Sequence, residues 1–262
     1  MMADWKWANW EKESNVAIIT IDHPPANALA RPVAREIIGC LNEIAKEPAV
    51  RAVVITGAGD KFFIGGGDIK TFPEQQRMEM EELKAHIKVG HETFNTIENF
   101  SKPVIAAING MALGGGCEVA IACDLRIAAE NTVLGLPEIK LGLFPGGGGT
   151  QRLPRLIGKS KALELMLLGE SISAREALSI GLVNMVIPEG QALKKAKEIA
   201  QKIAGRSRTA ISAIKEAVNR GIDVPKQHGL DIEIDLFARV FKSENASEGV
   251  SAFIEKRAPQ FK

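Results

Sequence analysis

Short runs of consecutive apolar residues alternate along the first part of the chain with longer segments in which apolar residues recur at helical spacing. The runs are as long as strands, and their continuous hydrophobicity is typical of strands that are buried on both faces. They cover residues 16–21, 52–56, 103–108 and 124–128. The longer segments, residues 31–46 and 78–100, predict amphipathic helices. Strands that alternate with helices predict an α/β fold with a mainly parallel sheet.

The pattern changes near residue 159, where helical periodicity becomes almost continuous. One further strand is expected at residues 183–187, and helices are expected at residues 159–168, 174–180, 192–204, 209–220, 229–241 and 247–256. We therefore expect an α/β core over residues 1–190 and a helical C-terminal region over residues 191–262. Because apolar positions persist throughout that region, we expect its helices to pack against other parts of the protein. A subunit interface is one place where they could do so.

Two glutamates interrupt the most apolar and glycine-rich stretches of the chain. Glu118 lies within residues 111–123, and Glu138 lies within residues 133–145. A carboxylate in such surroundings is costly unless it is paired, hydrogen-bonded or protonated. Each glutamate alone has a simpler explanation as a favourable charge in the first turn of a helix. The pair, next to glycine-rich backbone, predicts a site for acid/base chemistry.

Three glycine-rich loops accompany these glutamates, at residues 65–67, 114–116 and 146–149. Glycine lets the backbone approach a ligand closely, and N–H groups at the start of a helix stabilise an oxyanion. Each loop alone could be only a tight turn, and the third could be a flexible linker. Prolines and apolar residues flank the third loop, which argues against free flexibility.

Composition restricts the cellular context and the class of partner. The chain has 262 residues and a formal net charge of +1, which argues against broad binding to nucleic acid or to an anionic membrane. Three cysteines without a C-x-x-C pair make a disulfide framework unexpected and fit the reducing cytoplasm. The apolar run at residues 104–123 contains Asn109 and Glu118, so we interpret it as packed interior rather than a membrane span.

Several common motifs of metal-binding and nucleotide-binding proteins are absent from the sequence. The four histidines do not show metal-ligand spacing. A phosphate-binding P-loop ending at Gly158 would require glycine where Leu153 stands, and a dinucleotide fingerprint would require glycine where Phe62 stands. Cys117 has no basic partner nearby in sequence, and we interpret it as a small buried residue.

The glycine loops and glutamates belong to a set of motifs that is specific in combination. The motifs are Pro25-Ala-Asn-Ala-Leu29, Phe63-Ile-Gly-Gly-Gly-Asp-Ile69, Lys102-Pro-Val-Ile-Ala-Ala-Ile-Asn-Gly110, Ala112-Leu-Gly-Gly-Gly-Cys-Glu118, Leu136-Pro-Glu-Ile-Lys-Leu-Gly142 and Pro145-Gly-Gly-Gly-Gly-Thr-Gln-Arg-Leu153. With them the chain resembles the crotonase (enoyl-CoA hydratase/isomerase) superfamily over residues 16–261. The resemblance implies a crotonase-like spiral of ββα turns, followed by a helical C-terminal region that builds trimers or hexamers.

The resemblance also implies roles for the residues of the site. The backbone N–H groups of Gly67 and Gly115 match the oxyanion hole for a thioester carbonyl. Glu118 and Glu138 match the two catalytic glutamates of the hydratases, and we assign Glu118 as the base and Glu138 as the acid. The N–H group of Gly146 matches a position that helps to hold the attacking water.

The resemblance further implies that CoA is part of the substrate and that no separate cofactor is needed. The CoA moiety is expected along Ala28, Asp68, Ile69 and Lys70. Tail residues Phe237, Phe253 and Lys256 match positions that reach the CoA or acyl group, partly from a neighbouring subunit. The sequence departs from the family pattern at three positions. Gly65 stands where alanine or serine is usual, Gly67 where alanine is common, and His23 where arginine is frequent.

Several functions are compatible with this resemblance. An enoyl-CoA hydratase is favoured over an enoyl-CoA isomerase, because isomerases commonly keep one of the two carboxylates. A hydratase for a branched substrate of the methylglutaconyl-CoA type is a further alternative. A non-catalytic acyl-CoA-binding protein would be expected to lose a glutamate, and an RNA-binding protein would be expected to carry a basic stripe.

Overall fold

A computed structural model describes residues 5–262, so residues 1–4 of the expected core lie outside the described residues. The larger of two sheets has six strands in the order β1-β2-β3-β5-β7-β10. Only the β1–β2 pair in it is antiparallel. The strands are β1 (Ala8–Glu13), β2 (Val16–Ile21), β3 (Ala52–Gly57), β5 (Val104–Ile108), β7 (Leu125–Ala129) and β10 (Met185–Ile187). The predicted mainly parallel sheet is confirmed.

Both faces of this sheet are buried, which explains why its strands are continuously apolar. Along β2, Ile19 belongs to one hydrophobic cluster and Ile18 to another on the opposite face. Helix α1 (Arg31–Ala45) contributes its apolar stripe to the first cluster. Helix α8 (Ala192–Ala204) covers the second face with alanines at positions 192, 196 and 200. Small side chains at four-residue spacing let this helix approach the sheet closely.

A second, four-stranded sheet was not predicted. It consists of β4 (Phe62–Ile64), β6 (Met111–Leu113), β8 (Val133–Gly135) and β9 (Ile172–Ser173), in that order. The first three strands run parallel, and β9 is antiparallel to β8. Strands of two or three residues are too short to show a hydrophobic period, which is why the sequence pattern missed them.

The two sheets are joined by a repeated unit in which a strand of the large sheet is followed by a strand of the small sheet and then by helix. The units are β3–β4 followed by η1 (Ile69–Thr71), α2 (Phe72–Gln75) and α3 (Met80–Glu98); β5–β6 followed by α4 (Gly115–Ala122); and β7–β8 followed by η2 (Pro137–Leu141) and α5 (Gly149–Ile157). These are the ββα turns that the resemblance implied. Helices α6 (Lys159–Leu168) and α7 (Ala174–Ser179) complete the core.

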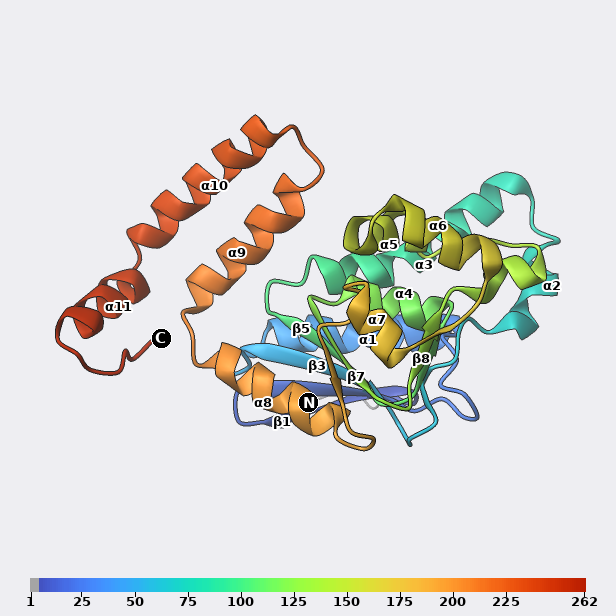
Figure 1. Cartoon of the computed structure of the whole chain (residues 1–262), viewed down its shortest axis with the longest axis horizontal. Helices are drawn as coiled ribbons and strands as arrows, with labels where there is room; N and C mark the ends of the chain where they lie inside the picture. The colour runs from blue at the N-terminus through green and yellow to red at the C-terminus, as the bar shows by residue number, and fades with distance from the viewer. Residues whose placement is uncertain (1–4) are drawn as a thin grey trace.

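Three helices stand away from both sheets at the C-terminus, as Figure 1 shows in orange and red. They are α9 (Arg208–Gly221), α10 (Lys226–Phe241) and α11 (Glu244–Ile254). Lys215 of α9 forms an ion pair of 2.6 Å with Asp124 of the core. Several large apolar side chains of these helices are exposed, among them Ile214 at 63%, Phe237 at 65% and Phe253 at 86%. Within residues 5–262, the helices are too short or too polar to cross a membrane.

Candidate active site

Two glycine loops and a short helix meet where parallel strands of the small sheet end. In the register of the sheet, Phe62 of β4 lies opposite Met111 of β6, and Leu113 of β6 lies opposite Gly135 of β8. The segments that follow these strands therefore emerge at one edge. They are the glycine loop at 65–67, the glycine loop at 114–116 and the 3-10 helix η2 that carries Glu138. Segments more than 70 residues apart along the chain are thereby brought together.

The two glycine loops place Gly67 and Gly115 next to each other. The carbonyl of Gly66 accepts a hydrogen bond of 2.7 Å from the N–H of Leu29, which holds the first loop. A Cβ atom at Gly115 would lie 3.6 Å from the nitrogen of Gly67. Within the described residues, neither Gly67 nor Gly115 donates its N–H to another group of the chain. Two neighbouring backbone donors are thus free to bind an oxygen of a ligand.

Glu118 is buried in the first turn of α4, with 4% of the residue exposed. Its Oε1 atom accepts hydrogen bonds from the N–H groups of Gly147 at 2.7 Å and Gly149 at 2.8 Å. Burial raises the pKa of Glu118, while the two N–H groups oppose that rise because they stabilise the ionised form. The carboxylate therefore has one anchored oxygen, and its other oxygen, Oε2, is left for chemistry.

Glu138 lies beside the second glycine loop. A Cβ atom at Gly114, whose φ is +50°, would approach Glu138 Oε1 to 3.0 Å. The Oε2 atom of Glu138 is buried without a hydrogen-bond partner among the described residues. Burial raises the pKa of Glu138 to about 7, and the nearby Glu118 carboxylate contributes to the increase. Such a group can exchange a proton near neutral pH, so the two carboxylates are suited to opposite roles in proton transfer.

The hydrogen bonds that Gly147 and Gly149 donate to Glu118 are not predicted by the sequence. These glycines lie 29 and 31 positions from Glu118 along the chain, a separation that no local pattern reveals. The available signal is the run of four glycines after Pro145, which by itself predicts only a loop. Phe94 is a further residue that the sequence pattern does not point to. A Cβ atom at Gly147 would overlap its ring, so this ring packs against the loop.

The residues expected to bind CoA near the glycine loops lie in two adjoining segments, residues 28–29 and 67–70. Ala28 precedes Leu29, which bridges to Gly67, and the Ala28 carbonyl oxygen lies 2.8 Å from Nδ1 of His23. Asp68 accepts a hydrogen bond from the N–H of Lys70. Residues Ile69 and Lys70 are exposed, as is Gly146 in the third loop.

Within one chain, the tail residues do not lie near these two segments. Phe237 and Phe253 lie on α10 and α11, and Lys256 follows α11. These helices stand away from the glycine loops (Figure 1). A role for these residues in the site therefore requires the tail of another copy.

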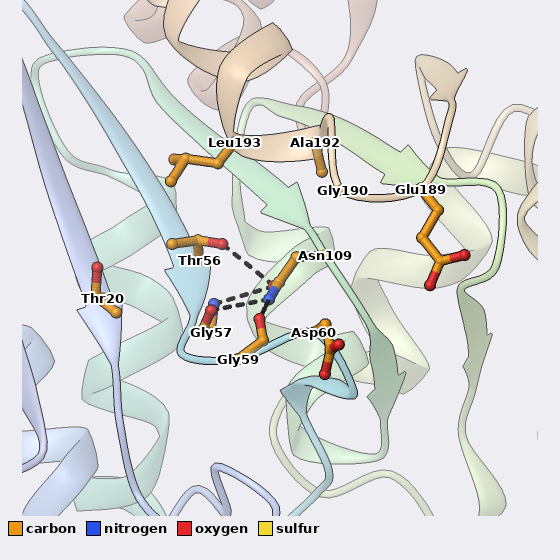
Figure 2. A pocket seen from close by; sticks show the side chains of 10 residues that line it. All are labelled: Thr20, Thr56, Gly57, Gly59, Asp60, Asn109, Glu189, Gly190, Ala192 and Leu193. Carbon is orange, nitrogen blue, oxygen red and sulfur yellow. Dashed lines mark hydrogen bonds between the residues drawn. The ribbon is translucent and has the colours of Figure 1, made fainter.

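A separate hollow of about 440 Å³ lies where β2, β3 and β5 end, beside the start of α8 (Figure 2). The side chain of Asn109 spans its wall and bonds to Thr56, Gly57 and Gly59. These polar atoms satisfy one another, so we interpret Asn109 as a residue that fixes the loop after β3. Among residues 5–262, His, Cys, Asp and Glu side chains do not gather in groups of three or more that could hold a metal ion.

Comparison with known proteins identifies the family of this chain. The profile of the enoyl-CoA hydratase/isomerase family matches residues 11–262. The chain is 43% identical to the short-chain-enoyl-CoA hydratase of Clostridium acetobutylicum over 94% of each chain, and 43% identical to the crotonyl-CoA hydratase of Syntrophomonas wolfei over 96% of each. The crystal structure of enoyl-CoA hydratase from Bacillus anthracis superposes with a TM-score of 0.91 and 41% identity, covering 98% of this chain and 99% of that one. By sequence and by fold, the chain belongs to the enoyl-CoA hydratase/isomerase family.

Proposed function

We propose that this chain is an enoyl-CoA hydratase, which adds water across the 2,3 double bond of a 2-enoyl-CoA thioester to give a 3-hydroxyacyl-CoA. The observation that carries the proposal is the pair of carboxylates, Glu118 and Glu138, beside two free backbone donors. The relatives named as hydratases support the same reaction. An isomerase needs only one carboxylate to move a proton, whereas hydration uses two.

The N–H groups of Gly67 and Gly115 would bind the thioester carbonyl oxygen. When water adds to C3, negative charge develops on this oxygen as the enolate forms. Donors that are already oriented stabilise that charge without reorganisation, and this is commonly the largest single contribution to catalysis. The donors are backbone groups, so the unusual glycines at positions 65 and 67 leave them in place.

Glu118 would act as the general base and Glu138 as the general acid. Glu118 accepts a proton from the water as its oxygen bonds to C3, and Glu138 supplies the proton that bonds to C2. The hydrogen bonds from Gly147 and Gly149 favour the ionised form of Glu118, whereas the unpartnered oxygen and raised pKa of Glu138 favour its protonated form. The N–H group of Gly146 would help to orient the water.

The pH dependence of the reaction follows from these protonation states. The acid must be protonated, and the pKa of Glu138 is about 7, so kcat/KM is expected to decline as pH rises through about 7. The base must be ionised, so kcat/KM also declines at low pH. Initial rates over a pH series check this, and Glu138→Gln should lack the alkaline decline. A wild-type rate that stays constant far above pH 7 would contradict the assignment of the acid.

We further propose that Ala28, Asp68, Ile69 and Lys70 contact the CoA moiety, with CoA entering only as part of the substrate. Residues 191–262 would serve oligomerisation and complete the acyl-CoA site. In that region, Phe237, Phe253 and Lys256 would contact the CoA or acyl group of a neighbouring subunit. The three cysteines are buried free thiols, which is compatible with a cytoplasmic location.

The exposed apolar side chains of α9–α11 predict a homo-oligomer. Clusters of this kind on a monomer mark interaction sites. We expect analytical ultracentrifugation of the wild-type protein to show a trimer or a hexamer. Sedimentation as a monomer at micromolar concentration would exclude a tail that completes a neighbouring site.

The hydratase proposal is tested with purified protein and crotonyl-CoA as a short 2-enoyl thioester. Loss of the enoyl-thioester absorbance, with 3-hydroxybutyryl-CoA as the product, is the expected result. A parallel reaction with a 3-enoyl-CoA tests the isomerase alternative. Conversion of the 3-enoyl thioester without hydration of crotonyl-CoA would replace the hydratase proposal by an isomerase, and a branched methylglutaconyl-type thioester tests the remaining alternative.

A further inference from the structure

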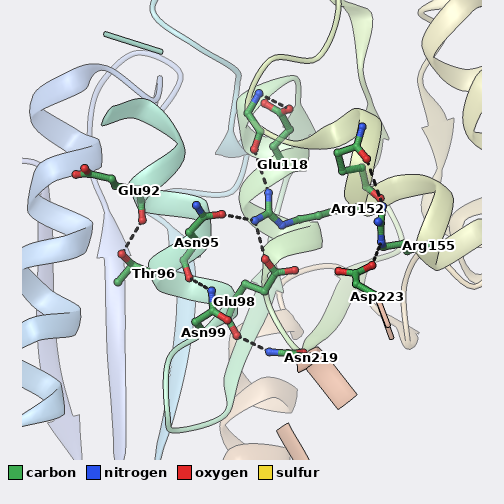
Figure 3. Close-up of polar contacts among 12 residues, drawn as sticks. Glu92, Asn95, Thr96, Glu98, Asn99, Glu118, Arg152, Arg155, Asn219 and Asp223 are labelled. Carbon is green, nitrogen blue, oxygen red and sulfur yellow. Dashed lines mark hydrogen bonds and ion pairs between the residues drawn. The ribbon is translucent and has the colours of Figure 1, made fainter. Parts of the chain in front are cut away.

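Arg152 of α5 is bonded to the loop that holds Glu118. Its Nη1 atom donates to the carbonyl oxygen of Gly147 at 3.2 Å. The N–H group of the same glycine donates to Glu118 Oε1 at 2.7 Å. Figure 3 shows the guanidinium directed from α5 toward this loop and toward α3. One residue of the loop thus links the arginine to the carboxylate.

The other side of the guanidinium is anchored on α3. Its Nη2 atom donates to Asn95 Oδ1 at 2.9 Å and to Glu98 Oε2 at 2.7 Å. The carbonyl of Glu98 in turn accepts a hydrogen bond of 3.0 Å from Asn219 of α9 (Figure 3). The planar guanidinium therefore has three acceptors in fixed directions, an arrangement that the point charge of lysine cannot reproduce.

The surroundings of Arg152 differ from those of an ordinary surface cation. Only 11% of its side chain is exposed. A Cβ atom at Gly148, whose φ is +106°, would overlap Arg152 Nη1, so glycine at that position makes room for the guanidinium. Exposed ion pairs contribute little to stability. A nearly buried guanidinium that donates a hydrogen bond to a backbone carbonyl instead fixes the conformation of that backbone.

We propose that Arg152 is a positioning residue, which ties the loop at 147–149 to α3 and so keeps two N–H groups directed at Glu118. This inference rests on the proposed hydration reaction, in which Glu118 is the base. Arg152 does not need to contact the substrate. It acts through Gly147, and its removal should affect the chemical step rather than CoA binding.

The charged groups around Glu118 give the expected direction of the effect on pH dependence. Burial raises the pKa of Glu118, and the N–H groups of Gly149 and Gly147 oppose that rise, as do the positive charges of His91 on α3 and Arg152 on α5 to a smaller extent. The carboxylate of Glu138 lies close enough to interact with Glu118. Without Arg152, one positive charge is lost and the two N–H donors are no longer fixed. The pKa of Glu118 should therefore rise, and the decline of kcat at low pH should move to higher pH.

The test compares Arg152→Ala with Arg155→Ala on the same helix. Arg155 bonds to exposed Asp223 and to Gln151, and none of its hydrogen bonds involves the loop at 147–149. We expect Arg152→Ala to lower kcat by about 10²-fold, the order of loss expected when a catalytic group is misplaced by about 1 Å. KM should change little, and the decline of kcat at low pH should move to higher pH. Added guanidinium ion should restore part of the rate. Arg155→Ala should match the wild type in all of these measurements.

Two further measurements separate positioning from simple destabilisation. Glu98→Ala keeps the guanidinium but removes one anchor, and it should shift the acid decline in the same direction by a smaller amount. NMR titration of the isotope-labelled Glu118 carboxyl reports its pKa without any turnover, so the inference stays testable if crotonyl-CoA is not hydrated. Unchanged kcat and pH profile in folded Arg152→Ala would overturn the inference. An unchanged Glu118 titration in both variants would overturn it as well.

Discussion

Replacing Glu118 by glutamine is expected to lower kcat for crotonyl-CoA hydration by about 10²- to 10⁴-fold, the usual contribution of a general base. The amide has nearly the same shape as the carboxylate, but it cannot accept a proton from water. Its carbonyl oxygen can still accept the hydrogen bonds from Gly147 and Gly149. The loop should therefore remain in place while the base is lost.

The control for this substitution is Glu92→Gln on the exposed surface of α3. It changes the same functional group outside the site and should leave kcat unchanged. Glu138→Gln should also lower kcat strongly, because the proton for C2 would be missing. Steady-state rates and thermal unfolding curves are measured for all variants. Wild-type rates in both Glu118→Gln and Glu138→Gln would refute a mechanism that uses the pair.

The substitution Gly147→Ala is expected to have the second largest effect. A Cβ atom at this position would overlap both Glu118 Oε2 and the ring of Phe94. Phe94 is 5% exposed and cannot move away freely, so the loop or the carboxylate must shift. Overpacking of this kind costs about 1–3 kcal/mol of stability, and displacement of a catalytic group costs about 10²-fold in kcat.

Gly90→Ala provides the matched control for Gly147→Ala. A Cβ atom at Gly90 of α3 would meet nothing within 4 Å. Alanine is also the better helix former, so this variant should be at least as stable as the wild type. The measurements are kcat and the thermal midpoint for both variants. If Gly147→Ala retained the kcat of Gly90→Ala, the close packing of Glu118 against the third loop would not matter for activity.

The predicted elements are those with a helical period or with a continuous apolar run. The predicted helix at 192–204 coincides with α8, and the strand at 16–21 coincides with β2. In contrast, β4, β6 and β8 have three residues each and carry no period of their own. They are nevertheless the strands that bring the glycine loops and η2 to one edge. The part of the fold that builds the site was thus the part that the pattern could not reveal.

Part of the site could also be predicted from the sequence. Glu118 and Glu138 were recognisable because carboxylates in apolar, glycine-rich sequence require an explanation. Their different environments were not recognisable. The N–H groups that anchor Glu118 come from a distant loop, and the free oxygen of Glu138 is a property of packing. Likewise, the sequence does not distinguish Arg152 from other basic residues, whereas its contacts with Gly147 and α3 do.

The central claim is that Glu118 and Glu138 act together to add one water molecule to a 2-enoyl thioester. Its most direct test is to incubate the purified protein with crotonyl-CoA in water enriched in a heavy oxygen isotope and to analyse the thioesters by mass spectrometry. The account predicts a 3-hydroxy thioester that carries the label on its hydroxyl group, and almost none with the Glu118→Gln/Glu138→Gln double variant. Recovery of unlabelled crotonyl-CoA alone, or an isomer with a shifted double bond and no label, would contradict it.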